Sequence, residues 1–346
     1  MLDSAESGFA ANPMPLAKIP LIDLRGHTPL DLLFLFRSRA RTLAAAALGM
    51  VKPPFSLILP GVERASRRWL ERSKNPYFGE IRLIANAVGV PGAYTLNLCP
   101  EWFCTSGVWA GEHGPLLRRV LDWPITGLGE SVVVAHQSGK AGDFFNVTWP
   151  GFSGIVQAMA PKRFAAAINQ APMRRHNAGL LGDWLLGRLS AGRRHAMPPA
   201  HLLRHIFETA RDYTAAKSLL CGIPLAVPTI FTLAGTRPGE GCVVERTEED
   251  YAVRELSGGQ VCAANQFESP LNDAGQGWRP RPIDSPGRYA CAAAIKGTAP
   301  GFAWFTPPIA NPNSRLVMTA NAASGTLAAM GMAGPEPVTQ TFDLAA

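Results

Sequence analysis

The sequence has little charge and few cysteines for its length. Only 17% of its 346 residues are charged, below the roughly 25% that is typical of soluble domains. Hydrophobic residues make up 47% of the chain, which is enough for a sizeable core and excludes a disordered protein. The 6 cysteines form no C-x-x-C pair, which argues against both a disulfide scaffold and a structural zinc site.

A secretory signal and long apolar runs are also missing. Residues 1–20 hold Asp3, Glu6 and Lys18 and contain no unbroken apolar stretch long enough for the apolar core of a signal peptide. No apolar run approaches the roughly 20 residues that cross a bilayer, and the run over residues 218–235 is broken by two prolines. We therefore expect a soluble, cytoplasmic protein with reduced cysteines and no stable membrane span.

Several common catalytic motifs do not occur. There is no G-x-S-x-G nucleophile turn, no phosphate-binding loop and no dinucleotide-binding G-x-G-x-x-G. His201 and His205 are one helical turn apart, but Glu does not follow His201 and no third ligand accompanies them. The net charge of +7 comes from scattered basic pairs without a nucleic-acid-binding motif. We expect no metal, no organic cofactor and no nucleic-acid partner.

The pattern of apolar residues changes at Cys104. The first hundred residues are helical in pattern, with helices predicted over 62–74 and 77–88. Short apolar runs between turn residues then predict antiparallel strands, over residues 104–109, 116–121, 131–135, 144–148, 154–159 and 164–168. A helical stretch over 173–222 follows, and strands resume over 225–233, 242–245, 251–256 and 261–264, with a last hairpin over 315–332. This order predicts an α+β protein with a large antiparallel core and no interdomain linker.

Cys104 begins the first predicted strand and is a candidate nucleophile. If the bond between Phe103 and Cys104 is cut, the thiol can attack while the new α-amine, with a pKa of about 7.7–8, takes the proton. The thiol itself could make this cut by attacking the Phe103 carbonyl, which shifts the acyl group from nitrogen to sulfur before hydrolysis. The alternative is that Cys104 is a small buried strand residue, as most free cysteines are.

Two charged residues lie on the next strand, near its end. A hairpin turn at residues 111–114 returns the chain, so that Arg119 and Asp122 come alongside the start of the Cys104 strand. A carboxylate there can hold the free amine, and a guanidinium can lower the pKa of a thiol. As an ordinary ion pair at a strand end they would contribute only about 0–1 kcal/mol.

Together these residues resemble a known family. Cys104-Thr-Ser, the Arg119-x-x-Asp122 element and the order of the later segments resemble the N-terminal-nucleophile (Ntn) hydrolases of the choloylglycine hydrolase group. Within it, the self-processing acid ceramidase and N-acylethanolamine amidase branch is the most similar. No single motif is specific, but the similar segments recur in order from residue 77 to residue 332. The spacing from nucleophile to Asp is one residue shorter than usual, and Gln266 replaces the more usual aromatic or His.

The resemblance implies a four-layer αββα sandwich with antiparallel sheets, preceded by an N-terminal helical segment, and hydrolysis of a linear amide C–N bond. Residues 1–103 would form a retained α-chain and residues 104–346 a β-chain, together one domain. Cys104 would be the nucleophile, and Arg119 and Asp122 would orient its thiol and its amine.

Three later residues complete the implied site. Asn265 resembles the family Asn that donates to the oxyanion, an interaction whose loss typically costs about 2.7–4 kcal/mol in the transition state. Asn169 resembles a second polar residue at the edge of the site, and Arg288 resembles the late family arginine, with Arg281 as a fallback. Both Asn residues end strands, where Asn commonly makes turns, and a surface position is the alternative for Arg288.

The sequence thus predicts a self-cleaving thiol amidohydrolase that acts on a small-molecule N-acyl amide. Its oligomeric state is left open, and a homo-oligomer is compatible with the sequence. The apolar segments 32–36 and 184–186 could line a groove for a fatty or aromatic acyl chain, but we favour burial in the core for both. Two alternatives remain. The acyl group held as a thioester on Cys104 could be transferred to an amine in place of water, as in the penicillin-forming acyltransferases. Alternatively, the fold could belong to a catalytically silent binding or scaffold protein.

Overall fold

A short strand and a group of helices come before the sheets in the computed structural model. It describes residues 15–50, 59–73, 75–98, 102–272, 277–279, 281 and 283–344. The first elements are β1 (Leu21–Asp23), α1 (Pro29–Leu35), α2 (Arg37–Gly49), α3 (Leu59–Arg72), α4 (Phe78–Val88) and α5 (Ala93–Leu98). The predicted N-terminal helical segment is confirmed, since α3 and α4 match the helices expected over 62–74 and 77–88; residue 74 lies outside the described residues.

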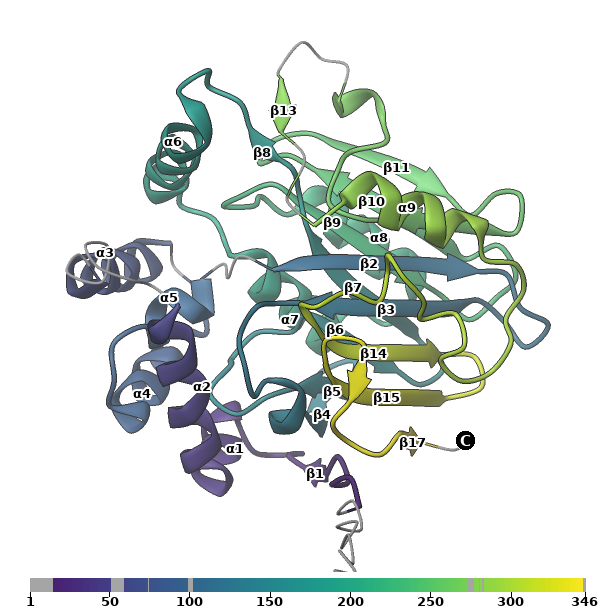
Figure 1. Ribbon diagram of the computed structural model, residues 1–346, viewed down its shortest axis with the longest axis horizontal. Coiled ribbons are helices and arrows are strands. Elements are labelled where there is room, and N and C mark those ends of the chain that lie inside the picture. The colour runs from purple at the N-terminus through teal and green to yellow at the C-terminus, as the bar shows by residue number, and fades with distance from the viewer. Residues whose placement is uncertain are drawn as a thin grey trace, which may run out of the picture.

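Helix α4 illustrates why these residues form helices. Its apolar residues Ile81, Ile84 and Val88 recur at helical spacing and are all buried. The helix ends at Gly89, which adopts a left-handed conformation with φ of 71°. The helices gather at one end of the sheets (Figure 1).

The first sheet contains the strand that begins at the candidate nucleophile. Its strands are β2 (Phe103–Trp109), β3 (Leu116–Asp122), β12 (Gln260–Ala263), β14 (Ser314–Asn321), β15 (Thr326–Ala333), β16 (Glu336–Pro337) and β17 (Phe342–Leu344). They are arranged in the order β12-β2-β3-β14-β15-β16, with β17 also paired to β15. The predicted strands over 104–109 and 116–121 and the C-terminal hairpin are confirmed.

The second sheet packs against the first. It consists of β4 (Val133–Gly139), β5 (Gly142–Thr148), β6 (Gln157–Ala160), β7 (Phe164–Gln170), β9 (Thr229–Ala234), β10 (Gly241–Arg246) and β11 (Tyr251–Glu255). Its order is β1-β4-β5-β6-β7-β9-β10-β11, so the N-terminal β1 joins this sheet, pairing with β4 in parallel.

Three of these strands start later than predicted. The strand expected over 131–135 begins at Val133. The strand expected over 154–159 begins only at Gln157, because the Ile155 amide donates to the Ala200 carbonyl at 2.9 Å and not to a neighbouring strand. The strand expected over 225–233 begins at Thr229, directly after Pro228, because proline cannot donate to a ladder.

Helices cover both outer faces of the paired sheets. Helices α7 (Pro199–Thr209) and α8 (Tyr213–Gly222) pack on the second sheet, and α9 (Ser285–Ala294) packs on β2 and β12 of the first (Figure 1). The four-layer αββα architecture with antiparallel sheets is therefore confirmed. The main core fills the space between the sheets, where the alanines of β7 allow close packing.

The segment predicted to be helical over 173–222 is more divided than expected. It starts with a short strand, β8 (Met173–Arg174), which pairs with β13 (Trp278–Arg279), and continues with α6 (Gly179–Arg193). Helices α7 and α8 are separate because the Asp212 side chain caps α8, accepting a hydrogen bond from the Ala215 amide at 2.8 Å.

The expected burial of residues 184–186 is wrong. Trp184, Leu185 and Leu186 are 41%, 52% and 40% exposed, because α6 has apolar residues on all sides and stands away from the sheets (Figure 1). Segment 32–36 is divided: Leu32 and Leu33 are buried, whereas Phe34 and Leu35 are exposed.

Two further properties concern the whole described chain. None of its helices combines the length and the apolarity needed to span a bilayer. The cysteines within the described ranges, at positions 104, 221, 242, 262 and 291, are all free thiols.

Candidate active site

Cys104 is the second residue of β2, and the predicted hairpin brings both charged residues of β3 beside it. Phe103 lies opposite Asp122 and Ser106 lies opposite Arg119 in the antiparallel register. Because side chains alternate along a strand, Cys104, Ser106 and Arg119 face the second sheet, whereas Asp122 faces α9. The thiol and the carboxylate therefore lie on opposite faces of one sheet.

The Cys104 thiol is completely buried next to a guanidinium. Burial raises its pKa, and the Arg119 guanidinium acts in the opposite direction, lowering it. Arg119 is itself fully buried and donates through Nε to Gln157 Oε1 at 3.2 Å and through Nη1 to Asn169 Oδ1 at 3.1 Å. The cation that can stabilise a thiolate is thus fixed in the interior.

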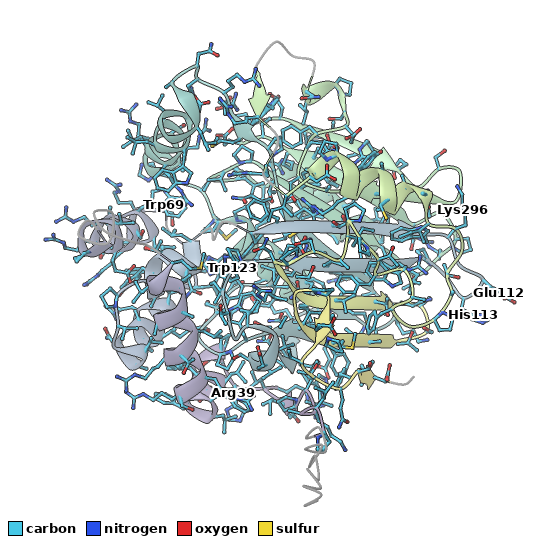
Figure 2. The ribbon with its side chains drawn as sticks, in the orientation of Figure 1. Arg39, Trp69, Glu112, His113, Trp123 and Lys296 are labelled. Carbon is cyan, nitrogen blue, oxygen red and sulfur yellow. The ribbon has the colours of Figure 1, made fainter. Side chains whose placement is uncertain are left out.

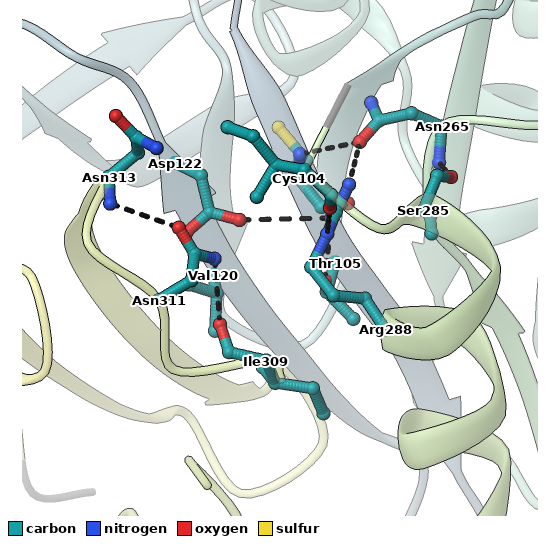
Figure 3. A network of polar contacts seen from close by, with 12 residues as sticks. Cys104, Thr105, Val120, Asp122, Asn265, Ser285, Arg288, Ile309, Asn311 and Asn313 are labelled. Atoms are coloured by element: carbon teal, nitrogen blue, oxygen red, sulfur yellow. Dashed lines mark hydrogen bonds and ion pairs between the residues drawn. The ribbon is translucent and has the colours of Figure 1, made fainter. Parts of the chain in front are cut away.

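The backbone nitrogen of Cys104 points to Asn265 (Figure 3). It donates to Asn265 Oδ1 at 2.9 Å, while Asn265 Nδ2 donates to the Gln170 carbonyl at 2.8 Å. The amide oxygen, not the amide nitrogen, therefore faces Cys104. The predicted role of Asn265 as an oxyanion donor stays a prediction, whereas its proximity to the nucleophile is established.

Arg288 extends from α9 into the centre of this cluster (Figure 3). Its Nη2 donates to Asn265 Oδ1 at 2.7 Å, and its Nη1 donates to Thr105 Oγ1 at 2.9 Å and to the Cys104 carbonyl. The same Nη1 lies 3.7 Å from Asp122 Oδ2. Burial lowers the pKa of Arg288, and the facing carboxylate of Asp122 opposes that shift.

The fallback arginine lies elsewhere. Arg281 Nε donates to the carbonyl of Ala171 at 3.0 Å, beyond the end of β7. Of the two late arginines that the resemblance suggested, Arg288 is the one that the fold brings to Cys104.

Asp122 is a fully buried carboxylate. Burial raises its pKa, while Arg288 and the hydrogen bond from Ser314 lower it. Ser314 Oγ donates to Asp122 Oδ1 at 2.7 Å from the opposite position on β14. The sequence analysis missed Ser314, because 192 residues separate it from Asp122 and no local motif marks the contact.

Asn169 links the two sheets at the nucleophile. Its Oδ1 accepts from Ser106 Oγ at 2.9 Å and from Arg119, and its Nδ2 donates to the carbonyls of Ala263 and Ala264 at 3.1 and 3.0 Å. It is completely buried, so it lies within the site and not at the predicted edge. Ser106 and Gln157 are further members of this cluster that the sequence analysis did not identify.

An apolar cavity of about 30 Å³ lies between the N-terminal helices and the sheets. Side chains of α2, α4 and α5 form one wall, and Trp123, Trp149 and Phe152 form the other. Trp123 directly follows Asp122, and its ring lies 5.8 Å from that of Trp102, two residues before Cys104. Figure 2 shows Trp123 at the end of the sheets that faces the helices, with Glu112 and His113 in the β2–β3 turn at the opposite end.

A larger cavity of about 80 Å³ opens beyond the end of β7. It is lined by Gln170, whose carbonyl holds Asn265, together with Met173, Trp184 of α6 and Arg281. Within the described ranges, no group of three or more His, Cys, Asp or Glu side chains is placed so that it could hold a metal ion.

Comparisons with known proteins find relatives that match part of the chain. No family model matches the chain. Acid ceramidase from Heterocephalus glaber is 26% identical over 219 residues, which is 57% of this chain and 54% of that protein. The N-acylethanolamine-hydrolyzing acid amidase from Cavia porcellus is 25% identical over 234 residues, or 64% of this chain and 62% of that protein.

A solved structure gives a weaker match. The Caenorhabditis elegans ortholog of N-acylethanolamine-hydrolyzing acid amidase has a TM-score of 0.47 and 15% identity, covering 70% of this chain and 100% of that one. The chain spans about half the length of the curated acid ceramidases it matches. The resemblance to the Ntn hydrolases is confirmed by the curated relatives. They come from its acid ceramidase and N-acylethanolamine amidase branch.

Proposed function

We propose that the chain is a self-cleaving thiol amidohydrolase of the Ntn type that hydrolyses the linear amide bond of N-acyl amines. One observation carries this proposal: Cys104 presents its thiol to Arg119 and its backbone nitrogen to Asn265 Oδ1, 2.9 Å away. An acceptor aimed at that nitrogen suits both the amide of the uncut chain and the amine that a cut would create.

The proposed self-cleavage uses this arrangement. The Cys104 sulfur attacks the Phe103 carbonyl carbon, the C–N bond breaks, and the Cys104 nitrogen takes up a proton to become the α-amine. Water then hydrolyses the thioester, which leaves a carboxylate on Phe103 and a free thiol on Cys104. The new N-terminus lies against the side chain of Asn265, next to the strand that carries Asp122.

The mature site uses the same atoms for turnover. The α-amine accepts the thiol proton, and the sulfur attacks the acyl carbon of the substrate. The leaving amine takes the proton, and water regenerates the thiol from the thioester. Arg288 holds Asn265 and faces Asp122, so the two groups that orient the amine share one fixed cation.

The cavity beside Trp123 has the apolar lining that an acyl group requires, and at about 30 Å³ it must widen to admit a chain. Its lining contains aliphatic side chains such as Leu43 and Leu128 and the aromatic rings of Trp149 and Phe152, with no charged residue. The names of the curated relatives include an N-acylethanolamine hydrolase. We therefore choose N-dodecanoylethanolamine as the first substrate to test, with N-acetylethanolamine as the short-chain control.

Intact-mass analysis tests the processing step. We expect the 37.0 kDa chain to separate into two species at the Phe103–Cys104 bond, and Cys104→Ala to remain uncut. Persistence of the cut in Cys104→Ala would rule out self-processing. A wild-type chain that stays whole and inert would favour the silent scaffold.

Product analysis tests the reaction. Release of dodecanoate and ethanolamine by the wild type, and none by Cys104→Ala, is the expected result. Addition of a panel of amines separates hydrolysis from acyl transfer. New amides formed at the expense of dodecanoate would make the protein an acyltransferase instead.

A further inference from the structure

The contacts of Arg119 leave one of its nitrogens for the thiol. Nε donates to Gln157 Oε1 at 3.2 Å, and Nη1 donates to Asn169 Oδ1 at 3.1 Å and to the Val120 carbonyl at 3.2 Å. Nη2 is buried and has no hydrogen-bond partner within the described part of the chain. A buried guanidinium nitrogen without an acceptor is costly. The Cys104 thiol lies near the Arg119 guanidinium and, as a thiolate, can supply that acceptor.

Gln157 determines the direction of this guanidinium. It is completely buried on β6, which pairs with β5 and β7 on its two sides. Its Nε2 donates to the Val147 carbonyl of β5, so the amide cannot flip without losing this bond, and Oε1 must face Arg119. Gln157 is thus an acceptor of fixed orientation, placed on the sheet opposite to the one that carries Cys104 and Arg119.

The loss of this acceptor would release the guanidinium. Without Gln157 Oε1, the Arg119 Nε becomes a second buried donor with no partner. The side chain would then rotate toward another acceptor, and this rotation would turn Nη2 away from the Cys104 sulfur. Burial raises the pKa of the Cys104 thiol, so at neutral pH the thiolate depends on that nearby cation.

We propose that Gln157 is a positioning residue for the nucleophile: it fixes Arg119 so that Nη2 faces the Cys104 sulfur. It does not touch the substrate or the reacting atoms. This inference rests on the proposed self-cleavage and adds a residue from the opposite sheet to the machinery. It also accounts for a buried glutamine that bridges the two sheets.

The test compares two substitutions of the same kind. Gln157→Met removes the acceptor and keeps the side-chain volume. Gln137→Met is the matched control, because Gln137 is also buried in the second sheet and its Oε1 accepts a hydrogen bond from Asn146, not from Arg119. The rate of self-cleavage is followed by intact mass after cell-free synthesis of the full chain, between pH 6 and pH 10.5.

We expect Gln157→Met to cleave at least tenfold more slowly than the wild type at pH 7. The deficit should shrink as the pH rises through the pKa of the wild-type thiol, because the wild-type rate then levels off while the rate of the variant still increases. Gln137→Met should stay within threefold at every pH. Gln157→Glu, which keeps an acceptor facing Nε, should recover part of the loss at pH 7.

The shape of the pH profile decides the outcome. A merely structural role for Gln157 would slow cleavage equally at every pH, or would lower the melting temperature without changing the profile, and either result overturns the inference. An unchanged profile in Gln157→Met together with normal wild-type cleavage refutes the inference alone. A wild-type chain that does not cleave refutes the proposed function, and the inference falls with it.

Discussion

Replacement of Arg288 by Met removes the cation that faces a buried carboxylate. Arg288 and Asp122 are both fully buried, 3.7 Å apart, and Arg288 also donates to Thr105 and Asn265. The loss of one partner of such a pair typically costs about 3–5 kcal/mol, since the other charge stays buried. We expect Arg288→Met to lower the free energy of unfolding by at least about 3 kcal/mol at pH 7.

The assay is urea unfolding followed by tryptophan fluorescence, with Cys104→Ala present in every variant so that the chain stays whole. Arg288→Met with Asp122→Asn is the informative combination, because it removes both charges. It should be more stable than Arg288→Met alone by about 2 kcal/mol, since no charge is then left without a partner. A cost below about 1 kcal/mol for Arg288→Met, or a double variant no more stable than the single one, would refute this reasoning.

The same pair has a defined pH dependence. Burial raises the pKa of Asp122 above its value in the unfolded chain. The stability that its protonated form contributes is therefore present in acid and is lost as the pH rises through the folded-state pKa. Without Arg288 to oppose burial, that loss grows. The deficit of Arg288→Met should accordingly be smaller at pH 5 than at pH 8.

Three further changes probe other parts of the molecule. His201 is buried, its Nδ1 lies 2.8 Å from Asn75 Nδ2, and burial lowers its pKa from 6.5 to about 3, so stability should fall as the pH drops below 6.5. At pH 4.5 this loss is about 2–3 kcal/mol; His201→Gln should lack it, and unchanged urea midpoints at pH 7 and 4.5 would contradict the assignment. Ser314→Ala removes a donor to Asp122 and should cost about 1.5–3 kcal/mol in urea unfolding; a cost near zero would speak against an ionised Asp122. Leu43→Trp fills the apolar cavity and should lower kcat/KM for the dodecanoyl substrate at least tenfold but that for the acetyl substrate less than threefold; equal losses would place the acyl chain elsewhere.

The position of Arg119 and Asp122 beside Cys104 could be predicted from the sequence, because a hairpin fixes its own register. Once the turn is placed at residues 111–114, the pairing of β2 with β3 follows from the alternation of side chains. The succession of strands along the chain could also be predicted, because turn residues and short apolar runs are local signals.

The contacts between the sheets could not be predicted in this way. Gln157 and Ser314 reach the site only because two sheets stack and two distant strands pair, and neither has a distinctive neighbour in the sequence. The helix that carries Arg288 was also missed, although Asp284 caps it and Pro286 occupies its first turn. The exposure of α6 was misjudged because apolar composition predicts burial only when the fold supplies a surface to pack against.

The pairing of strand β1 affects how the protein would refold after cleavage. It precedes the proposed cut, yet it pairs in parallel with β4, so a cut chain would hold one sheet built from two polypeptides. Refolding of the intact chain is a first-order process, whereas reassembly of the two pieces requires them to meet and becomes concentration-dependent. Self-cleavage would then make folding a single, irreversible event, and the lifetime of the mature protein would be set by its rate of unfolding.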